Sequence, residues 1–162
     1  KYYTEKLALQ FSELYDIDTA ALRYFNIFGP RQDPNGDYAA VIPKFISLML
    51  DGEYPIIYAD GEQSRDFTFI DNAVQANILA AERDVTGETL NVGCGGRITI
   101  NELVDTLNDL LNTNIDAIYD DPRPGDVRHS HADISKAKDR VGYDPDVGFR
   151  DGLERTVPYY RA

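Results

Sequence analysis

The chain has 162 residues, a length typical of one domain with its own hydrophobic core. Apolar residues make up 43% and aromatic residues 11%, so the composition excludes an intrinsically disordered protein. No run of about 18 apolar residues occurs, which excludes a membrane-spanning helix. The single cysteine, Cys94, excludes an internal disulfide framework and fits a reducing cytoplasm.

The charge is strongly acidic, with 28 acidic residues against 16 basic ones and a net charge of −12. The acidic residues are spread along the chain, so they do not form an acidic tail. Because nucleic-acid binding needs a basic surface, this charge argues against a nucleic acid as partner. An acidic, lysine-poor surface is favoured in a high-salt cytoplasm, where salt screens self-repulsion. A halophilic source and an ordinary acidic enzyme both remain open.

The opening residues KYYTEKLALQF predict an amphipathic helix, because Tyr3, Leu7, Phe11 and Leu14 recur at helical spacing. A helix normally begins after a side chain that caps its first N–H groups. No residue precedes Lys1, so we expect that the sequence is a piece of a longer protein.

Strands and helices are predicted to alternate along the rest of the chain. The apolar run 18–29 and the run 88–93 predict buried strands, and further strands are expected within 54–64, 65–70 and 114–120. Helices are expected at 38–52, 71–83, 99–111, 133–142 and 149–160, with a turn at 31–36 and a loop at 123–133. This alternation predicts an α/β fold with a largely parallel sheet.

Several residues predict where these helices begin and end. Asp71 and Asp133 are expected to cap the helices that follow them, and Thr99 with Glu102 has the spacing of a capping box. Gly52 and Gly142 are expected to stop the preceding helices.

The segment NVGCGGRITINEL places Gly93, Gly95 and Gly96 between a strand and a helix, as a dinucleotide-binding loop would. Ile98 stands where the third glycine of that fingerprint belongs, so a structural turn is favoured over a pyrophosphate cradle.

No metal site and no cysteine nucleophile are expected. His129 and His131 share one face of an extended segment, but no third ligand lies nearby at metal-binding spacing. Cys94 lacks a neighbouring base in the sequence, which favours an inert small residue.

The most informative stretch is 22–45, LRYFNIFGPRQDPNGDYAAVIPKF. Its strand places Asn26 at the carboxyl edge of the sheet, where open α/β sheets bind ligands. The Asn26 amide offers a donor and an acceptor to a sugar or phosphate oxygen. A simple turn-forming role for Asn26 is an equal alternative on the pattern alone.

This stretch, with GEQSRDFTFIDNAVQANILAA, LNVGCGG and RPGDVRHSHADISKAK, resembles the C-terminal half of NAD-dependent nucleotide-sugar epimerases. These belong to the extended short-chain dehydrogenase/reductases, and the similarity is greatest to UDP-glucose and UDP-N-acetylglucosamine 4-epimerases. It covers essentially the whole chain. The resemblance implies that 1–162 forms the end of a Rossmann domain plus a nucleotide-sugar-binding subdomain, without the N-terminal NAD-binding segment.

The resemblance also implies a role for Lys1. In this family a Tyr-x-x-x-Lys motif lies on a long helix, and Lys1 matches its lysine, with the tyrosine four residues upstream of this sequence. The tyrosinate takes a proton from the sugar 4-hydroxyl while NAD takes the hydride, through a transient 4-keto sugar. A lysine one helical turn away favours the phenolate and contacts the cofactor. Lys1 is therefore a candidate catalytic and NAD-binding residue, with an exposed helix lysine as the alternative.

Other residues are implied to hold the two ligands. Arg65 and Arg123 match family arginines that grip the diphosphate, and Asn26 matches a substrate-contacting asparagine. Tyr24 and Phe25 match a segment near the nicotinamide, and the residues matching the nucleotide-wrapping segments are Val41, Ile42, Lys44, Ile56 and Tyr58. Tyr58 stacks on the uracil in one interpretation and packs in the core in the other. Asp126 is expected to brace the arginine loop.

The implied function is a UDP-sugar 4-epimerase, with the isolated chain inactive because the tyrosine and the glycine-rich NAD fingerprint are absent from it. Ala59 departs from the glycine of many relatives. Alternatives are a nucleotide-sugar 4,6-dehydratase or decarboxylase, and a non-catalytic dinucleotide or nucleotide-sugar sensor. In this family the helix of the Tyr-Lys motif pairs with its copy, so a homodimer is expected for the whole enzyme.

Overall fold

The computed structural model describes residues 1–35 and 40–161 of the chain. Its helices are α1 (Tyr2–Tyr15), α2 (Val41–Leu50), α3 (Ile70–Glu82), α4 (Ile100–Leu111), α5 (Ser135–Val141) and α6 (Phe149–Tyr160). Its strands are β1 (Ala20–Tyr24), β2 (Asn26–Phe28), β3 (Ile56–Tyr58), β4 (Ser64–Arg65), β5 (Phe67–Phe69), β6 (Glu88–Val92), β7 (Ile98–Thr99) and β8 (Ile118–Asp120). The end of the predicted turn 31–36 and the start of the predicted helix 38–52 lie outside the described residues.

The strands pair in twos, and most of the pairs are parallel. The pairs β1–β6, β2–β5 and β3–β8 are parallel, whereas β4 and β7 are antiparallel. The α/β class and the parallel pairing are therefore confirmed. The expectation of one larger sheet is wrong for the described residues, which form four separate two-stranded sheets.

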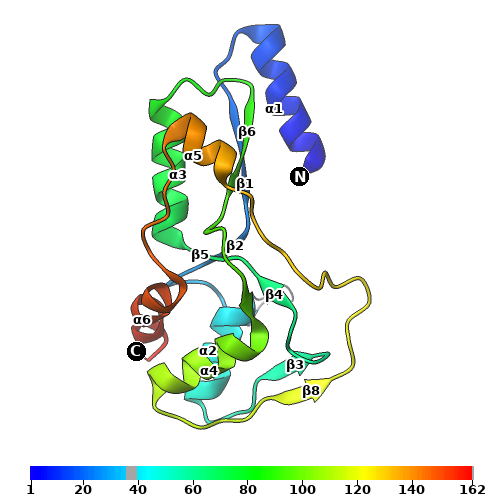
Figure 1. Cartoon of the computed structure of the whole chain (residues 1–162), viewed down its shortest axis with the longest axis vertical. Coiled ribbons are helices and arrows are strands. Elements are labelled where there is room, and N and C mark those ends of the chain that lie inside the picture. Colours follow the sequence, from blue (N-terminus) through cyan, green and yellow to red (C-terminus); the bar gives the residue numbers. More distant parts are fainter. Residues whose placement is uncertain (36–39, 162) are drawn as a thin grey trace.

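The molecule is elongated and has two lobes (Figure 1). We call α1, α3, α5, β1 and β6 the upper lobe, and α2, α4, α6, β3 and β8 the lower lobe, and the short strands β2, β4 and β5 lie between them. Each lobe has its own core. The upper core contains Leu90, Val92, Val141 and Tyr143, whereas the lower core is larger and contains the buried rings of Phe28, Phe45, Phe67 and Phe69.

The predicted strand 18–29 is divided at Phe25. β1 pairs with β6, and β2 moves over to pair with β5, so the two halves of the run enter different sheets. The break costs no backbone hydrogen bond at Phe25, because its N–H donates to Val92 at 3.0 Å. The expectation of a fully buried strand is wrong for β1, where Ala20, Arg23 and Tyr24 are exposed.

The predicted strand 65–70 is divided in the same way. Arg65 ends β4, Asp66 lies between the strands, and β5 begins at Phe67. Asp66 therefore directly follows Arg65, at the junction of the two strands.

The helix boundaries follow the capping signals in part. Thr99 and Glu102 form the predicted capping box at α4. Gly52 and Gly142 follow α2 and α5 with φ of 75° and 73°, a conformation that favours glycine, so both predicted helix ends are confirmed.

The two predicted aspartate caps are wrong. Phe69 is the N-cap of α3, and Asp71 lies inside the first turn, where its charge meets the positive end of the helix dipole. Ile134 is the N-cap of α5, while Asp133 just before it accepts hydrogen bonds from the N–H and hydroxyl of Ser135.

The helix predicted at the start of the chain is confirmed as α1, but none of its residues is buried. Tyr2, Tyr3 and Leu14 expose more than 60% of their surface. No described helix is both long and apolar enough to cross a lipid bilayer.

Candidate functional site

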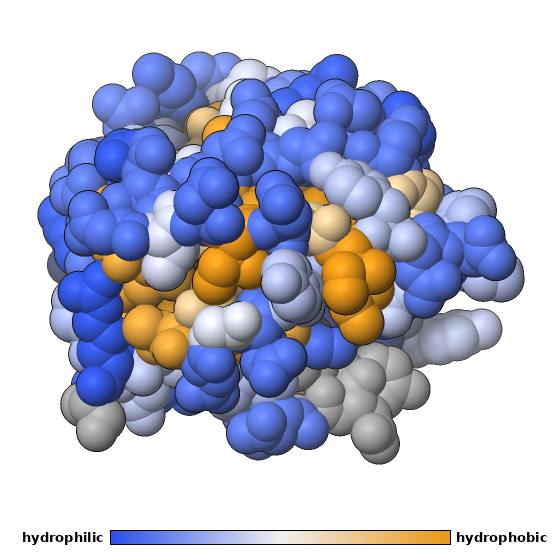
Figure 2. Space-filling view, turned by 90° about the horizontal axis from the view of Figure 1, so that it is seen from below, coloured by the Kyte–Doolittle hydropathy of each residue, from blue (hydrophilic) through white to orange (hydrophobic). Residues whose placement is uncertain are grey.

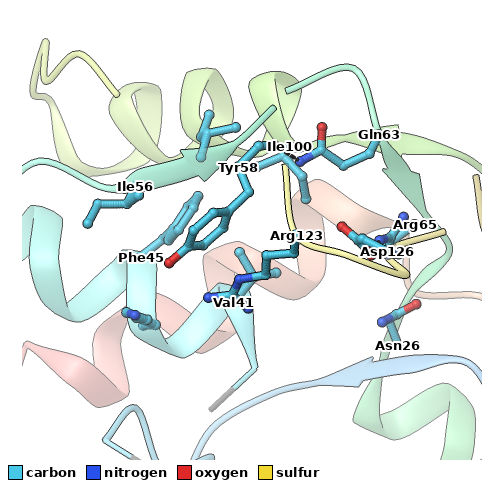
Figure 3. Close-up of a pocket in the computed structure, with 12 residues that line it drawn as sticks. Asn26, Val41, Phe45, Ile56, Tyr58, Gln63, Arg65, Ile100, Arg123 and Asp126 are labelled. Atoms are coloured by element: carbon cyan, nitrogen blue, oxygen red, sulfur yellow. Dashed lines mark hydrogen bonds and ion pairs between the residues drawn. The ribbon is translucent and has the colours of Figure 1, made fainter. Parts of the chain in front are cut away.

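A cavity of about 250 Å³ opens between α2, β3, β4 and the loop that follows β8 (Figure 3). Most of the residues predicted to bind substrate line it, although they come from segments far apart in the sequence. The lining residues are Asn26, Val41, Lys44, Phe45, Ile56, Ile57, Tyr58, Gln63, Arg65, Ile100, Arg123 and Asp126.

Arg123 lies across the cavity from the β4 side and stacks on an aromatic ring. Its guanidinium carbon Cζ is 3.8 Å from the centre of the Tyr58 ring, a close cation–π contact (Figure 3). Arg123 belongs to the exposed loop between β8 and α5. The guanidinium therefore has a planar partner on one face and keeps its edge N–H groups for other acceptors.

Arg65 is held more tightly than Arg123. Its side chain is only 15% exposed, and it forms an ion pair with Asp126 of the same loop that carries Arg123. Nη1 of Arg65 also donates to the backbone carbonyl of Ser64 at 2.8 Å. This ion pair fastens the loop to β4, which is the bracing role expected of Asp126.

Asn26 lies two residues beyond the carboxyl end of β1, as the first residue of β2. Its side chain is exposed and lines the cavity together with Arg65. Its backbone N–H donates to the carbonyl of Asp66 at 3.2 Å, so the asparagine is anchored while its amide side chain faces the cavity.

The opposite wall of the cavity is largely apolar. Val41 and Phe45 come from α2 and Ile56 from β3, and Ile56 stands next to Ile118 in the parallel β3–β8 register. Both isoleucines are exposed. Seen from below, the molecule shows apolar surface interspersed with hydrophilic side chains (Figure 2). Ile42, in contrast, is 1% exposed in the lower core and does not line the cavity.

The three residues predicted on the cofactor side are not among those lining this cavity. Lys1 is exposed at the start of α1 in the upper lobe. The Tyr24 hydroxyl donates to Asn77 Oδ1 at 2.9 Å, and Phe25 is half-buried at the break between β1 and β2. Tyr24 and Phe25 immediately precede Asn26, so they connect the upper lobe with the cavity.

Two backbone N–H groups of the glycine-rich turn after β6 are already bonded within the protein. The N–H groups of Cys94 and Gly95 donate to the carboxylate of Asp66 at 2.8 and 2.9 Å. A Cβ at Gly93 would approach Asp66 Oδ2 to 2.8 Å, so this glycine serves close packing. The turn is structural, as the sequence indicates.

Burial raises the pKa of the half-buried Cys94 thiol above its ordinary value, in keeping with an unreactive cysteine. His129 Nδ1 lies 2.9 Å from Ser64 Oγ, and His131 Nε2 lies 3.0 Å from the Gly95 carbonyl. No cluster of three metal-ligating side chains occurs within 1–35 and 40–161.

Sequence reasoning missed some of the site. Phe45, Ile57 and Ile100 line the cavity although they lie in apolar runs that signal only core packing. Gln63 also lines it, and its Nε2 donates to the Tyr58 carbonyl at 2.7 Å. Sequence reasoning also missed the buried Asp66, because in the alternating run 65–70 it lies on the face opposite Phe67 and Phe69 and looks exposed.

Comparison with known proteins places these observations in a family. A family model described as "NAD dependent epimerase/dehydratase family" matches residues 1–93. The structure of a UDP-N-acetylglucosamine 4-epimerase from Methanobrevibacter ruminantium, in complex with UDP-N-acetylmuramic acid, is 49% identical with a TM-score of 0.94. This alignment covers 99% of the present chain and 51% of that chain.

A UDP-glucose 4-epimerase from Thermotoga maritima, solved with UDP-glucose, is 41% identical with a TM-score of 0.95, over 99% of this chain and 52% of that one. A UDP-N-acetyl-alpha-D-glucosaminuronate decarboxylase from Bacillus cytotoxicus is 32% identical over 99% of this chain and 51% of its own length. The chain thus spans about half the length of these relatives. The predicted fold class, the C-terminal portion of an extended short-chain dehydrogenase/reductase, is confirmed. The chain belongs to the NAD dependent epimerase/dehydratase family.

Proposed function

We propose that this chain is the nucleotide-sugar-binding part of an NAD-dependent UDP-sugar 4-epimerase. One observation carries the proposal. Asn26, Arg65 and Arg123 come from three separate segments and line the same cavity. Had these side chains pointed to unrelated surfaces, no common diphosphate site would exist.

The charge of the cavity suits a diphosphate. A nucleotide-sugar diphosphate carries about two negative charges, and a chain with net charge −12 repels such a ligand unless local cations compensate. Arg65 and Arg123 bring two guanidinium groups, whose planar N–H edges match phosphate oxygens. Asp126 partly neutralises Arg65, which holds this arginine in place before ligand binds.

The apolar wall suits a pyrimidine ring. Ile56 and Val41 offer aliphatic contacts to the ring. Tyr58 offers a flat aromatic ring, and Arg123 stacks on one of its two faces. Lys44 is exposed at the cavity and adds a further positive charge near the bound nucleotide. These contacts support UDP as the common part of the ligand and leave the sugar to be identified by experiment.

In this proposal, residues of the upper lobe contribute to NAD binding. NAD supplies hydride transfer when it is bound. Lys1 is exposed on α1, so its ammonium is accessible to a cofactor and to a tyrosine one helical turn earlier. Tyr24 and Phe25 extend from this lobe to Asn26 and would line the nicotinamide side. The glycine-rich turn is a poor pyrophosphate site, because the Asp66 carboxylate already binds its Cys94 and Gly95 N–H groups.

A decarboxylase is the second candidate, supported by the relative from Bacillus cytotoxicus. It would use the same diphosphate grip with a different sugar. A homodimer of the whole enzyme through α1 is also part of the proposal, supported by the exposed Tyr3, Leu7 and Phe11 on that helix.

Calorimetric titration of the 162-residue chain with UDP tests the proposal. We expect saturable binding of UDP and of a UDP-sugar, with much weaker binding of ADP. Arg123→Ala should weaken UDP binding about tenfold or more, because a charge-assisted bond to phosphate is lost. Arg150→Ala, which removes an exposed arginine of α6 paired with Asp109, is the matched control and should bind normally. Absence of UDP binding by the unaltered chain would overturn the proposal.

A turnover assay tests the expected inactivity of the chain alone. We expect no conversion of UDP-glucose to UDP-galactose above background, since the tyrosine of the Tyr-x-x-x-Lys motif is not in this sequence. Measurable epimerisation by the isolated chain would contradict this part of the account.

A further inference from the structure

Asp66 is a buried carboxylate with no cation beside it. It is 1% exposed, and the ion pairs among the described residues do not include it. Removing an ionised carboxylate from water is costly unless hydrogen bonds replace the lost hydration. A charge at this depth therefore needs a specific set of donors.

The donors are backbone N–H groups from two distant segments. Oδ1 accepts from Cys94 N at 2.8 Å, and Oδ2 accepts from Gly95 N at 2.9 Å and from Ala132 N at 3.1 Å. The Thr68 hydroxyl donates to Oδ1 at 3.3 Å. The carboxylate thus joins the turn after β6 and the segment before α5 to the junction of β4 and β5.

The same junction carries two of the proposed ligand-binding residues. Arg65 immediately precedes Asp66, and the Asp66 carbonyl accepts the hydrogen bond from Asn26 N at 3.2 Å. Fixing Asp66 therefore fixes the backbone from which the Arg65 and Asn26 side chains project into the cavity.

The third ligand-binding residue is connected through the loop that ends at Ala132. Ser64 N donates to the Arg128 carbonyl at 2.9 Å, and Ser130 N donates to the Ser64 carbonyl at 3.0 Å. With the bond from Ala132 N to Asp66, residues 128–132 run alongside β4. This anchored end follows directly after the part of the loop that bears Arg123 and Asp126.

We propose that Asp66 is a positioning residue for the nucleotide-sugar cavity. It does not line the cavity, but its carboxylate sets the relative placement of Arg65, Asn26 and the Arg123 loop. This inference rests on the proposed function. An asparagine cannot replace it, because the amide nitrogen of Asn would face backbone N–H donors where Asp66 presents a second acceptor oxygen.

A double-mutant cycle in UDP binding tests this role. Asp66→Asn should weaken UDP binding about tenfold in protein that calorimetry shows to be folded. In the Asp66→Asn background, Arg65→Ala should reduce UDP affinity by a several-fold smaller factor than it does in the unaltered chain. The reason is that an arginine already displaced by Asp66→Asn contributes less to binding. A purely stabilising residue would lower the unfolding temperature and leave the dissociation constant of the folded protein unchanged.

Asn108→Asp is the matched control. Asn108 also fixes a loop through backbone bonds, donating to the Ile115 carbonyl and accepting from Ile115 N, but it does not line the cavity. Asn108→Asp should reduce stability and keep normal UDP affinity.

Hydrogen exchange of the unaltered chain provides a second measurement if Asp66→Asn does not fold. Saturating UDP should slow exchange of the Cys94, Gly95 and Ala132 amides at least tenfold more than exchange of the Ile115 amide. Equal slowing of all four amides, or an Asp66→Asn variant with unchanged UDP affinity, would overturn the positioning role alone. A chain that binds no UDP would overturn the proposed function and this role together.

Discussion

Helix α4 of the lower lobe and helix α1 of the upper lobe differ in capping and in burial. In the lower lobe, α4 begins at the Thr99–Glu102 capping box and buries Leu103, Leu107 and other apolar residues. In the upper lobe, α1 has a weaker apolar stripe, no side-chain cap and no buried residue. An amphipathic pattern thus identifies the face of a helix that can be covered, whereas burial requires a partner surface in the same chain.

The same contrast holds for the predicted site residues. Except for Ile42, those of the lower lobe and the strands beside it converge on one cavity, because α2, β2, β3, β4 and the loop after β8 approach each other there. Lys1, Tyr24 and Phe25, by contrast, do not reach this cavity. In the proposed function, the lower lobe and the strands beside it would bind the substrate, and the upper lobe would contribute residues to the cofactor site.

The largest expected effect contrasts the two helices directly. Leu107→Ala in α4 removes a side chain with 0% exposure and should lower the free energy of unfolding by about 3 kcal/mol. Leu7→Ala in α1, where the leucine is 54% exposed, should change it by no more than about 0.5 kcal/mol. Urea denaturation of both variants measures the difference, and equal losses would refute the contrast between the lobes.

The second prediction contrasts the site residues. Arg65→Ala should weaken UDP binding by about 2 kcal/mol, since Arg65 combines cavity lining with an ion pair that holds the Arg123 loop. Lys1→Ala should leave UDP affinity unchanged, because Lys1 lies in the upper lobe. Calorimetric titration of both variants with UDP is the measurement. A comparable loss of UDP affinity in Lys1→Ala would contradict the assignment of UDP binding to the lower lobe.

The third prediction sharpens the comparison of helix ends. Thr99→Ala removes the side chain that accepts from Glu102 N at 3.0 Å, and should cost about 1 kcal/mol of unfolding free energy. Thr99→Ser keeps the hydroxyl and is the control. A loss of similar size in both variants would mean that the methyl group, and not the cap, matters at Thr99.

The fourth prediction concerns backbone strain beside the cavity. Ala59 has φ of 63°, in the left-handed region that alanine rarely adopts. Ala59→Gly should raise the free energy of unfolding by about 0.5 kcal/mol, after the entropy cost of glycine is subtracted. Thermal unfolding measures this, and a destabilised glycine variant would show that the alanine methyl makes compensating contacts.

The smallest expected effect is a pH dependence of folding stability, to which carboxylates of both lobes contribute. Hydrogen bonds from Arg128 and from Lys136 hold the pKa values of Asp60 and Glu88 below their ordinary range. A carboxylate with a depressed folded-state pKa contributes stability above its unfolded pKa, and this is lost as the pH falls through the folded pKa. Unfolding temperatures should therefore drop below about pH 4. Glu88→Gln should make this drop slightly shallower, and an unaltered slope would show that the Glu88 pair contributes nothing.

The sequence was sufficient for several features with a local cause, although the predicted Asp71 and Asp133 caps are wrong. The helix at 99–111, the Thr99–Glu102 capping box and the glycines after α2 and α5 each depend on neighbours within a few residues, and each prediction is confirmed. The fold class followed from the alternation of strands and helices together with the resemblance to nucleotide-sugar epimerases.

Features that depend on distant partners were not predictable in this way. The run 18–29 is divided because its first half pairs with β6 and its second half with β5. No local sequence pattern specifies these two pairing partners. Asp66 looks like an exposed strand residue in sequence, and only folding brings the Cys94, Gly95 and Ala132 amides to it. Val41 and Ile42 are adjacent apolar residues, but they lie on different sides of α2, and only Val41 lines the cavity.

The central claim is that Arg65 and Arg123 grip one diphosphate, and side-chain NMR tests it most directly. The Nε–Hε signals of these two arginines, assigned by Arg→Lys substitution, should shift together during a UDP titration and saturate at the same concentration. The signal of Arg150, outside the cavity, should stay in place. Shifts of only one of the two signals, or of neither at saturating UDP, would contradict the account.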